Sequence, residues 1–413
     1  MKLRWKWSLA TLVLMFFWSG LVIFGALEGW FRQPIAPKDD AHAFMQAALE
    51  YVGANPSAAV SLVLIEAGEV HDSYFSPGIT SSTLFPLASM SKWFTAYGVL
   101  TLADMGKIDL DEPVSNYLTR WHLPPSKFDN SKVTVRRLLS HTAGLTDGLG
   151  FGDFDASAQV PAIEESLRDP MSSSGSKVQI SVGVEPGSEW NYSGGGYLLL
   201  ELVIEEVSGQ SFDAYMQDVL FTPLKMSRTT YNFLGDLDNV APSLYVDGKT
   251  APYYQYAASG ATGMASTAAD LTRLVQAQTS SAIFDSLPNK LFDQMRSPEA
   301  RLLGAPVWGL GTMLYVETSQ GAFIYGHAGQ NEPAINAEVR INPHSGDAIV
   351  MLATGNPSLA TRLGFLWTFW QTGRPDFLAT GPEIQRVLPL LGIGAALVLL
   401  LGAFGYWRKR HGS

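Results

Sequence analysis

The sequence predicts an α/β fold of the α+β kind, in which a mixed, mainly antiparallel sheet is flanked by helices. Strand-like segments lie near both ends of the chain, whereas its middle is mostly helical. The two ends would therefore join in one sheet, with a helical lobe inserted between them. Two long apolar stretches at the termini add one transmembrane helix on each side of this domain.

The first element is the apolar stretch "SLATLVLMFFWSGLVIFGAL", which covers residues 8–27 without a charge. About twenty apolar residues span the core of a bilayer, so residues 1–30 are predicted to form a cytoplasmic tail and a transmembrane anchor. A cleaved signal peptide is the alternative. The apolar run is longer than the usual core of a signal peptide, and no clean A-x-A site follows it.

The last element is the stretch "VLPLLGIGAALVLLLGAFGYW", residues 387–407, followed by a short tail at 408–413. A transmembrane helix is predicted here, and a buried core helix is the alternative. Basic residues flank the outer ends of both stretches, and positive flanks stay in the cytoplasm: Lys2, Arg4, Lys6, Arg408, Lys409 and Arg410. The region between them would lie outside the cytoplasm, at the inner or plasma membrane, facing the periplasm or the cell exterior.

Between the anchors, a linker at 34–40 leads into one domain predicted over residues 40–375. A helix is expected over 41–52, followed by a hairpin of two strands around the turn "EAGE". An apolar helix from Ser89 to Met105 comes next, with Gly106 as its stop signal. Residues 107–190 are predicted to mix helix and loop, and the stretch "PMSSSGSK" from Pro170 is expected to be a flexible insertion.

The second half of the domain contains further helices and then strands. Helices are expected over 197–207, 268–277 and 358–372. Apolar and β-branched residues predict four late strands, and each segment is given by its first residue: "GLGTMLYVET" from Gly309, "GAFIYGH" from Gly321, "AINAEVRI" from Ala334 and "DAIVMLAT" from Asp347.

Composition excludes several classes of function. The net charge is −10 and no basic stripe is present, which argues against nucleic-acid binding. The chain has no cysteine, so disulfides, zinc–thiolate sites and cysteine nucleophiles are excluded. No pattern for a cofactor or a metal is recognised, because "GDLDN" from Gly235 lacks the rest of a calcium loop. A Gly-x-Ser-x-Gly elbow is also missing, which disfavours an α/β-hydrolase.

The stretch "FPLASMSKWFTAYGVL" places Ser89 and Lys92 three residues apart at the start of an apolar helix. Residues i and i+3 are neighbours on one face of a helix, so a hydroxyl and an amine would lie side by side. They could be a nucleophile and its proton acceptor, or an ordinary polar face. The spacing alone is weak evidence, and a second copy, Ser174 and Lys177, lies in the Gly/Ser-rich loop, where no rigid element would hold it.

The surrounding blocks resemble the serine β-lactamase and penicillin-binding protein superfamily, and most of all its branch of class C β-lactamases, D-aminopeptidases and esterases. The blocks occur in the family's order over most of the exported region: "SMSK", "GKIDLDEPVSNYL" from Gly106, "VTVRRLLSHTAGLTDG" from Val133, "PGSEWNYSGGGYLLLELVIEEVSGQSF" from Pro186, "TGMASTAADLTRL" from Thr262 and "YGHAGQ" from Tyr325. Several blocks in the right order are far more specific than one motif.

The resemblance implies roles for individual residues. Ser89 would be the acyl-forming nucleophile, and Lys92 would share or relay its proton. Tyr192 resembles the tyrosine of the Tyr-x-Asn box, which serves as a base or proton shuttle. Residues 327–329 match the Lys-Thr-Gly box in a His-x-Gly form, so His327 and Gly329 would border the substrate. The backbone N–H groups of Ser89 and Gln330 would form the oxyanion hole.

The sequence departs from this pattern in two places. The tyrosine box reads Tyr192-Ser193-Gly194, without the asparagine that helps bind the substrate amide in β-lactamases. His327 replaces the lysine, and a histidine is not permanently charged near neutral pH. His141, in "LLSHTAGL", is interpreted as structural rather than catalytic.

The leading hypothesis is a membrane-anchored serine hydrolase that acts on an ester or a D-amino-acid amide or peptide at the cell envelope, without a cofactor or a metal. Its partners would be such a substrate and the lipid bilayer, and not nucleic acid. The alternatives are a catalytically weak receptor for penicillin or a cell-wall peptide, a true β-lactamase, and a structural membrane protein with an inactive fold.

Overall fold

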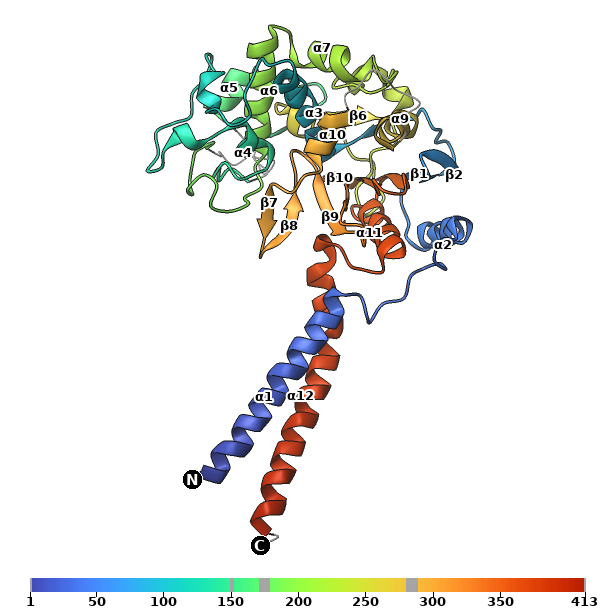
Figure 1. Cartoon of the computed structure of the whole chain (residues 1–413). Coiled ribbons are helices and arrows are strands. Elements are labelled where there is room, and N and C mark those ends of the chain that lie inside the picture. The colour runs from blue at the N-terminus through green and yellow to red at the C-terminus, as the bar shows by residue number, and fades with distance from the viewer. Residues whose placement is uncertain (1, 149–151, 171–178, 280–288, 412–413) are drawn as a thin grey trace.

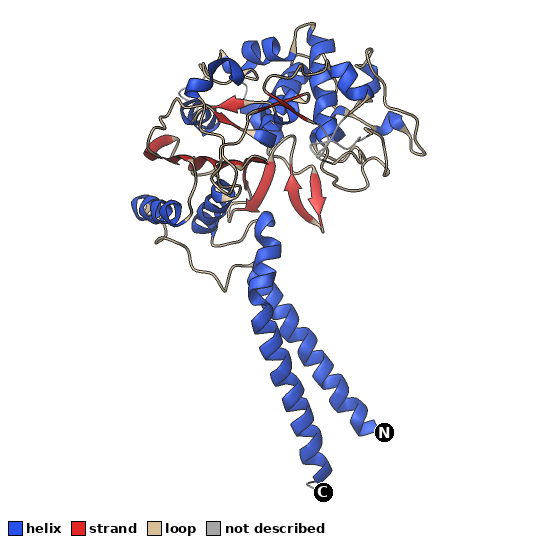
Figure 2. Cartoon of the chain, turned by 180° about the vertical axis from the view of Figure 1, so that it is seen from behind, coloured by secondary structure: helices blue, strands red, loops and turns tan. Residues whose placement is uncertain are grey.

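Two long helices project side by side from the part of the chain that contains the sheet (Figure 1). The computed structural model describes residues 2–148, 152–170, 179–279 and 289–411. The projecting helices are α1 (Lys2–Leu27) and α12 (Thr380–His411), and they pack against each other along their length. Both chain ends lie at the far end of this stalk, as the view from behind also shows (Figure 2).

An eight-stranded sheet forms the centre of the domain. The strands follow the spatial order β2 (Glu69–Phe75), β1 (Ala59–Glu66), β12 (Ala348–Thr354), β11 (Ile335–Ile341), β10 (Phe323–Asn331), β9 (Met313–Glu317), β8 (Ala305–Trp308) and β7 (Ala300–Leu302). Every neighbouring pair of strands is antiparallel. The sheet is therefore purely antiparallel, whereas the sequence predicts a mixed, mainly antiparallel one. Strand β1 pairs with β12, so the two ends of the domain are joined in one sheet as the sequence predicts.

Both faces of the sheet are covered by helices. In β1, Val60, Leu62 and Leu64 face a cluster that includes α2 (Ala41–Ala54) and α11 (Leu359–Thr372). The alternate residues Val63 and Ile65 face the larger core under the helical lobe. This alternation follows from the two-residue period of a strand, and it shows why β1 is apolar on both faces.

The inserted lobe lies between β2 and β7 and carries the remaining helices. They are α3 (Ser91–Asp104), α4 (Val135–Leu139), α5 (Ile163–Arg168), α6 (Gly194–Ser208), α7 (Phe212–Met216), α8 (Ser259–Thr262), α9 (Ala268–Thr279) and α10 (Asn289–Met295). Short helical turns η1 (Ala88–Met90), η2 (Val114–Asn116), η3 (Asn130–Lys132), η4 (Gln217–Phe221) and η5 (Phe233–Asn239) connect them, and η6 (Phe377–Ala379) precedes α12. Two small sheets pair β3 (Phe85–Pro86) with β6 (Ala265–Ser266) and β4 (Asp153–Asp155) with β5 (Tyr254–Tyr256).

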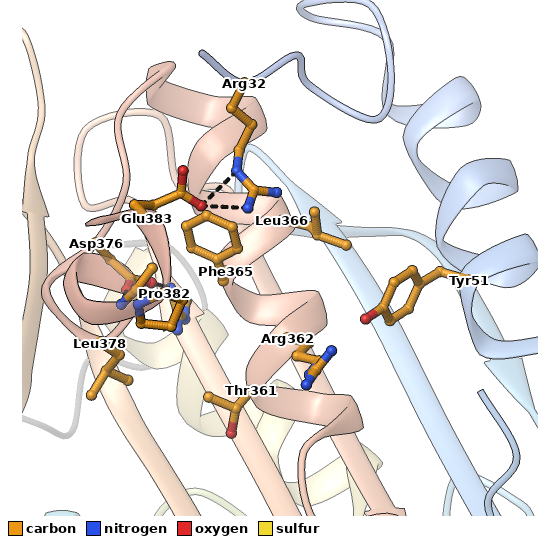
Figure 3. Close-up of a pocket in the computed structure, with 12 residues that line it drawn as sticks. Arg32, Tyr51, Thr361, Arg362, Phe365, Leu366, Asp376, Leu378, Pro382 and Glu383 are labelled. Atoms are coloured by element: carbon orange, nitrogen blue, oxygen red, sulfur yellow. Dashed lines mark hydrogen bonds and ion pairs between the residues drawn. The ribbon is translucent and has the colours of Figure 1, made fainter. Parts of the chain in front are cut away.

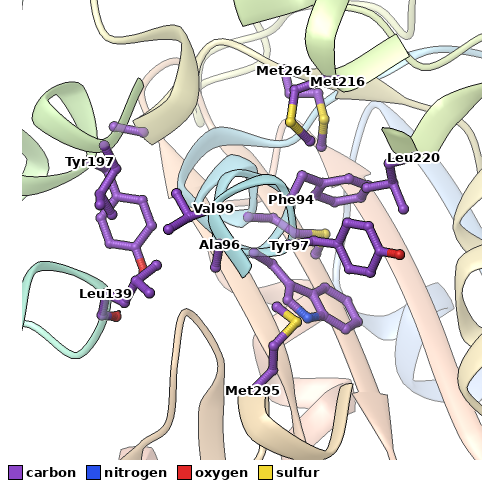
Figure 4. Packing of buried hydrophobic residues seen from close by; sticks show 14 of the residues in the cluster. Phe94, Ala96, Tyr97, Val99, Leu139, Tyr197, Met216, Leu220, Met264 and Met295 are labelled. Atoms are coloured by element: carbon purple, nitrogen blue, oxygen red, sulfur yellow. The ribbon is translucent and has the colours of Figure 1, made fainter. Parts of the chain in front are cut away.

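Helix α3 is the centre of the lobe and is buried on nearly every side. Figure 4 shows Ala96 and Val99 of α3 facing Tyr197, while Phe94 and Tyr97 face the opposite side. A helix that is apolar all round belongs in a core rather than on a surface. The packing therefore fixes α3 rigidly, and with it the residues at its N-terminal end.

Two element boundaries differ from the sequence prediction near the expected site. The helix predicted from Ser89 begins at Ser91, and Ser89 lies in the preceding 3₁₀ turn η1. Helix α6 begins at Gly194 rather than Tyr197, because the side chain of Ser193 accepts a hydrogen bond from the Gly196 N–H and caps the helix. Glycines have a low helix propensity, and here the cap outweighs it.

The late strands also differ in their limits. The segment from Gly309 forms a strand only over β9, and β10 runs on through Asn331, past the predicted end at His327. The short strands β7 and β8 are not predicted by the sequence. Of the expected flexible insertion at 170–177, residues 171–177 lie outside the described residues, and the pair Ser174 and Lys177 lies there too.

Two helices are long and apolar enough to cross a membrane, judged by length and composition alone: Leu9–Leu27 and Phe377–Arg408. Large apolar side chains on both are exposed. The helices approach closely at glycines, since a Cβ at Gly394 would lie 2.0 Å from the Trp18 ring and one at Gly402 would lie 2.4 Å from Thr11. Such small-residue contacts are typical of paired membrane helices.

Candidate active site

The turn η1 presents Ser89 at the base of the helical lobe. Ala88 has a φ of +47°, a left-handed conformation that costs energy in a residue with a Cβ. Ser91 holds this bend in place, because its hydroxyl donates to the Ala88 carbonyl at 2.8 Å and accepts from the Met264 N–H at 3.1 Å. The Ser89 side chain stays half-buried and therefore remains accessible from solvent.

Lys92 lies on the first turn of α3 and is 2% exposed. Its Nζ is 3.3 Å from Ser89 Oγ and 2.8 Å from the carbonyl oxygen of Ala261 in α8. Within the described part of the chain, Lys92 forms no ion pair with a carboxylate. A buried ammonium without a counter-ion is expensive, so its place beside a serine indicates a functional group rather than a structural ion pair.

Tyr192 completes the group that the sequence predicts. Its ring centroid is 5.0 Å from Lys92 Nζ, and the side chain is half-buried. His141 stacks on the Tyr192 ring with centroids 4.3 Å apart, and Trp308 meets the same ring edge-on at 5.8 Å. The structure thus brings Ser89, Lys92 and Tyr192 together from η1, α3 and the loop before α6.

A left-handed backbone conformation and one hydrogen bond fix the position of His141. Its φ is +57°, and its Nδ1 accepts from the Ser193 N–H at 3.1 Å. Burial lowers the pKa of His141 well below its usual value, and the charge of Lys92 lowers that pKa further. The ring is therefore neutral at working pH and acts as a flat support under Tyr192.

Strand β10 closes the other side of the site. A Cβ added at Gly329 would lie 1.9 Å from the Leu87 carbonyl oxygen and 3.2 Å from the Met90 nitrogen, so only glycine allows β10 to touch the turn that carries Ser89. Gln330 follows directly and is exposed. The Asn336 amide reaches back to the Gly329 carbonyl at 3.4 Å and bonds Thr361 Oγ1 at 2.9 Å, which ties β10 and β11 to α11.

His327, expected to border the substrate, is fully buried. Its Nδ1 lies 2.6 Å from the Ala328 carbonyl oxygen, so this nitrogen carries the proton and donates, while Nε2 has no partner among the described residues. Burial, and then the charge of Lys92, lower the pKa of His327 to about 3. The side chain therefore supplies no positive charge at neutral pH, and no part of it reaches the surface.

The position of the missing asparagine is taken by Gly194, whose N–H donates to the Gly148 carbonyl at 2.8 Å. Beside it, the buried Asp147 accepts from the Ser193 hydroxyl at 2.6 Å and from the Gly195 N–H at 2.7 Å. Burial raises the pKa of Asp147 above its usual value. This network fixes the loop that carries Tyr192, but it offers a substrate no carboxamide.

Two hydrogen bonds hold Gly260, the residue before the Ala261 carbonyl that Lys92 bonds. The buried Glu201 of α6 accepts from the Gly260 N–H at 2.8 Å, and the Thr95 hydroxyl donates to the Gly260 carbonyl at 2.7 Å. Burial raises the pKa of Glu201 to about 8. The sequence does not predict the roles of Ala261 and Glu201, because neither a backbone carbonyl nor a side chain that supports the neighbouring backbone forms a recognisable motif.

No group of three or more potential metal ligands occurs in the described ranges.

Solved structures share this architecture. EstCE1, described as a hydrolase with promiscuous acyltransferase activity, aligns with a TM-score of 0.62 at 20% identity, over 79% of this chain and 97% of that one. A D-amino acid amidase from Ochrobactrum anthropi aligns with a TM-score of 0.59 at 22% identity, over 80% of this chain and 97% of that one. At such identities the likeness shows the fold alone.

Comparison with curated sequences and with family models also finds related proteins. Penicillin-binding protein 4* of Bacillus subtilis is 35% identical over 155 residues, which cover 37% of this chain and 32% of that protein. The chain thus spans about a third of the length of the curated relatives it matches. The family model described as Beta-lactamase matches residues 45–364, which include Ser89, Lys92 and Tyr192. The chain therefore belongs to the beta-lactamase family of serine hydrolases.

Proposed function

We propose that the protein is a membrane-anchored serine hydrolase that forms an acyl-enzyme on Ser89 and acts on an ester or on the amide of a D-amino acid. The observation that carries this proposal is the buried Lys92, whose Nζ lies 3.3 Å from Ser89 Oγ without a carboxylate partner among the described residues. A hydroxyl next to a buried amine and a phenol is the arrangement that activates a weak nucleophile.

In the first half of the reaction, Ser89 Oγ attacks the carbonyl carbon and passes its proton to the pair formed by Lys92 and Tyr192. The oxyanion that develops would be held by the backbone N–H groups of Ser89 and Gln330. Removing one such donor typically costs about 3–4 kcal/mol of barrier. Tyr192 then returns the proton to the departing alcohol or amine, and the acyl group stays on Ser89.

In the second half, a water molecule attacks the acyl-enzyme. The same pair takes a proton from this water and returns one to Ser89 Oγ as the acid departs. The half-buried Ser89 leaves room for water to approach. The rings of His141 and Trp308, which contact the Tyr192 ring on its face and edge-on, hold it in one orientation through both halves.

The substrate class follows from what the site lacks. His327 is neutral and buried, and Gly194 has no side chain, so the site has neither the permanent cation nor the carboxamide that favour a β-lactam. We infer that an ester or a D-amino-acid amide suits this site better than a β-lactam does. EstCE1 and the D-amino acid amidase are examples of proteins with a similar fold that are described as a hydrolase and an amidase.

The stalk supports attachment to a membrane. Helices α1 and α12 expose large apolar side chains, and basic residues flank their outer ends. With both flanks in the cytoplasm, the catalytic domain would face the periplasm or the cell exterior. Fractionation with carbonate washing should keep the protein in the membrane pellet, and protease added outside the membrane should digest the domain. Release by carbonate would contradict this attachment.

The test of the catalytic proposal is Ser89→Ala in the full chain. The variant should lose covalent labelling by a fluorophosphonate and hydrolysis of a short-chain chromogenic ester. Ser73→Ala is the matched control, since Ser73 is exposed on the edge strand β2. If the Ser89→Ala variant is still labelled at the same site, the assignment is wrong.

A second candidate is a receptor that is acylated once and turns over very slowly. The glycine at position 194 favours it, because a site that binds an amide poorly can still be acylated. Steady-state turnover of a chromogenic acetate or butyrate ester separates the two functions. Many turnovers per chain support the hydrolase, whereas a single burst of product equal to the protein concentration supports the receptor. Nitrocefin in the same assay tests β-lactamase activity.

A further inference from the structure

A pocket that does not include Ser89 lies where the domain meets the stalk. Its volume is about 330 Å³, and it is bounded by α11, by the start of α12 and by the segment after α1 (Figure 3). Its wall combines three arginines with apolar side chains, among them Phe365, Leu366 and Pro382. A concave site with an apolar wall and a few charged groups suits an amphiphilic ligand.

Two of the three arginines on this wall are paired with carboxylates. Arg32 donates from Nε to Glu383 at 3.0 Å and also from Nη2, and its guanidinium lies over the Phe365 ring at 4.7 Å. Arg340 is paired with Asp376 and Glu338. Arg362 is exposed on α11, and its guanidinium makes no ion pair or hydrogen bond among the described residues. One cation is therefore open to an anion from outside.

A second arginine lines the pocket from behind. Arg340 is fully buried, and its Nη2 has no hydrogen-bond partner in the part of the chain that the structure describes. Its guanidinium lies over the Tyr315 ring at 3.8 Å, so it adds positive charge behind the wall without an exposed donor. The groups that an oxygen-rich ligand could contact are therefore Arg362 and the Thr361 hydroxyl.

The height of the pocket above the membrane identifies the ligand class. Helix α12 has 32 residues and is about 48 Å long at 1.5 Å per residue, whereas the hydrocarbon core is about 30 Å thick. The uncharged stretch over 387–407 fills that core, so the first turn of α12, with Pro382 and Glu383, lies in the layer of lipid headgroups. The groups that meet this pocket are therefore phosphates attached to acyl chains.

We propose that the junction pocket binds the headgroup of an anionic phospholipid, with its phosphate at Arg362 and its first apolar carbons against Phe365, Leu378 and Pro382. This inference rests on the proposed membrane attachment, but not on the chemistry at Ser89. The ligand is a lipid of the membrane that holds the stalk, and a soluble phosphate is the competing source that the test must separate.

The test uses the full chain in mixed micelles with equal amounts of phosphatidylglycerol and phosphatidylcholine, analysed by native mass spectrometry. The native chain should retain one phosphatidylglycerol in preference to phosphatidylcholine by at least about tenfold, because the choline ammonium partly neutralises its own phosphate, whereas the phosphate of phosphatidylglycerol is free to give Arg362 a full charge-assisted contact. R362Q should abolish the preference while its ester hydrolysis and thermal unfolding stay unchanged. The control R168Q removes an arginine of α5, on the lobe away from the stalk, and should keep it.

Three outcomes would overturn the proposal. The first is equal retention of both lipids by the native chain. The second is a preference that survives in R362Q, which would place the lipid elsewhere on the stalk. The third is loss of the bound lipid when inorganic phosphate is added at the concentration of the lipid, which would mark a site for a soluble anion. If the chain inserts into phosphatidylcholine micelles without any preference, only the pocket assignment fails, and the membrane attachment stands.

Discussion

His141 and His327 flank Lys92 and are both held without charge. His141 is 1% exposed and His327 is fully buried, and in both the burial lowers the pKa first and the Lys92 charge lowers it further. A buried cation next to Lys92 would raise the cost of burying that lysine, so neutral rings are the arrangement that the site can hold. The two histidines consequently make the folded state sensitive to acid.

The first prediction is that H327Q weakens this sensitivity. The pKa of His327 is about 3 in the folded chain, against an ordinary value of 6.5. Between pH 6.5 and pH 3, His327 binds a proton in the unfolded chain but not in the folded chain. The free energy of unfolding therefore falls as the pH falls from 6.5 towards 3. Urea unfolding between about pH 7 and pH 4 should give a shallower fall for H327Q. The exposed H42Q serves as the control, and equal slopes for the native chain and H327Q would contradict the prediction.

Glu201 makes the free energy of unfolding depend on pH in the opposite sense. Burial raises its pKa to about 8 from an ordinary 4.5, so between these values the folded chain keeps a proton that the unfolded chain loses. The free energy of unfolding therefore falls as the pH rises from 4.5 to 8. E201Q keeps an acceptor for the Gly260 N–H and has no proton to lose. Measured by urea unfolding relative to the native chain, it should be more stable at about pH 8 than at about pH 5; a constant difference would show that Glu201 does not titrate.

At the scale of elements, the site depends on β10 touching the turn η1. Gly329 lies against the Leu87 carbonyl, and Asn336 of β11 holds the Gly329 carbonyl from the other side. The proposed oxyanion donors, on Ser89 and Gln330, belong to these two elements. The width of the gap between them is therefore set by one glycine.

The third prediction is that G329A separates activity from folding. Its Cβ would lie 1.9 Å from the Leu87 carbonyl oxygen, so β10 must move away from η1. A displacement of about 1 Å can cost about a hundredfold in rate, and kcat for a short-chain ester should fall by at least that factor. G53A is the matched control, because no atom lies within 4 Å of the added Cβ on α2. If G329A keeps native kcat, the oxyanion hole does not include the residue after Gly329.

At the scale of the whole molecule, the sequence predicts more of the architecture than of the site. The pattern and order of the segments predict the sheet joined from both chain ends, the helical lobe and the two apolar helices. They do so because burial requires apolar residues to recur with the period of a helix or a strand. The spacing of Ser89 and Lys92 predicts that their side chains are neighbours, and the structure places them so, although Ser89 lies before α3 rather than in it. The Ala261 carbonyl, 169 residues away from Lys92, could not be found, since a backbone acceptor carries no side-chain signal.

The join between domain and stalk is another feature that only the fold reveals. Arg374 pairs with Glu28 at 2.6 Å, and Arg32 pairs with Glu383, so both ends of the domain are fastened to both helices. Gly29 allows this close fit, because a Cβ there would lie 2.3 Å from the Gly373 carbonyl oxygen. The domain therefore sits on the stalk in one orientation rather than on a loose tether.

The domain limit at residue 375, expected from composition, falls one residue before a buried contact, and this gives the last prediction. Asp376 bonds Arg340, which is fully buried and also donates to Glu338 at 2.8 Å. A chain of residues 40–375 would leave Arg340 with only one of its two carboxylate partners, and removing one partner of a buried ion pair typically costs about 3–5 kcal/mol, whereas a chain of residues 40–379 keeps Asp376 and its cap on the Ala379 N–H. Urea unfolding should show the longer chain to be more stable by about that amount, and D376A in the longer chain should reproduce the loss. Equal stability of the two chains would mean that Glu338 alone satisfies Arg340.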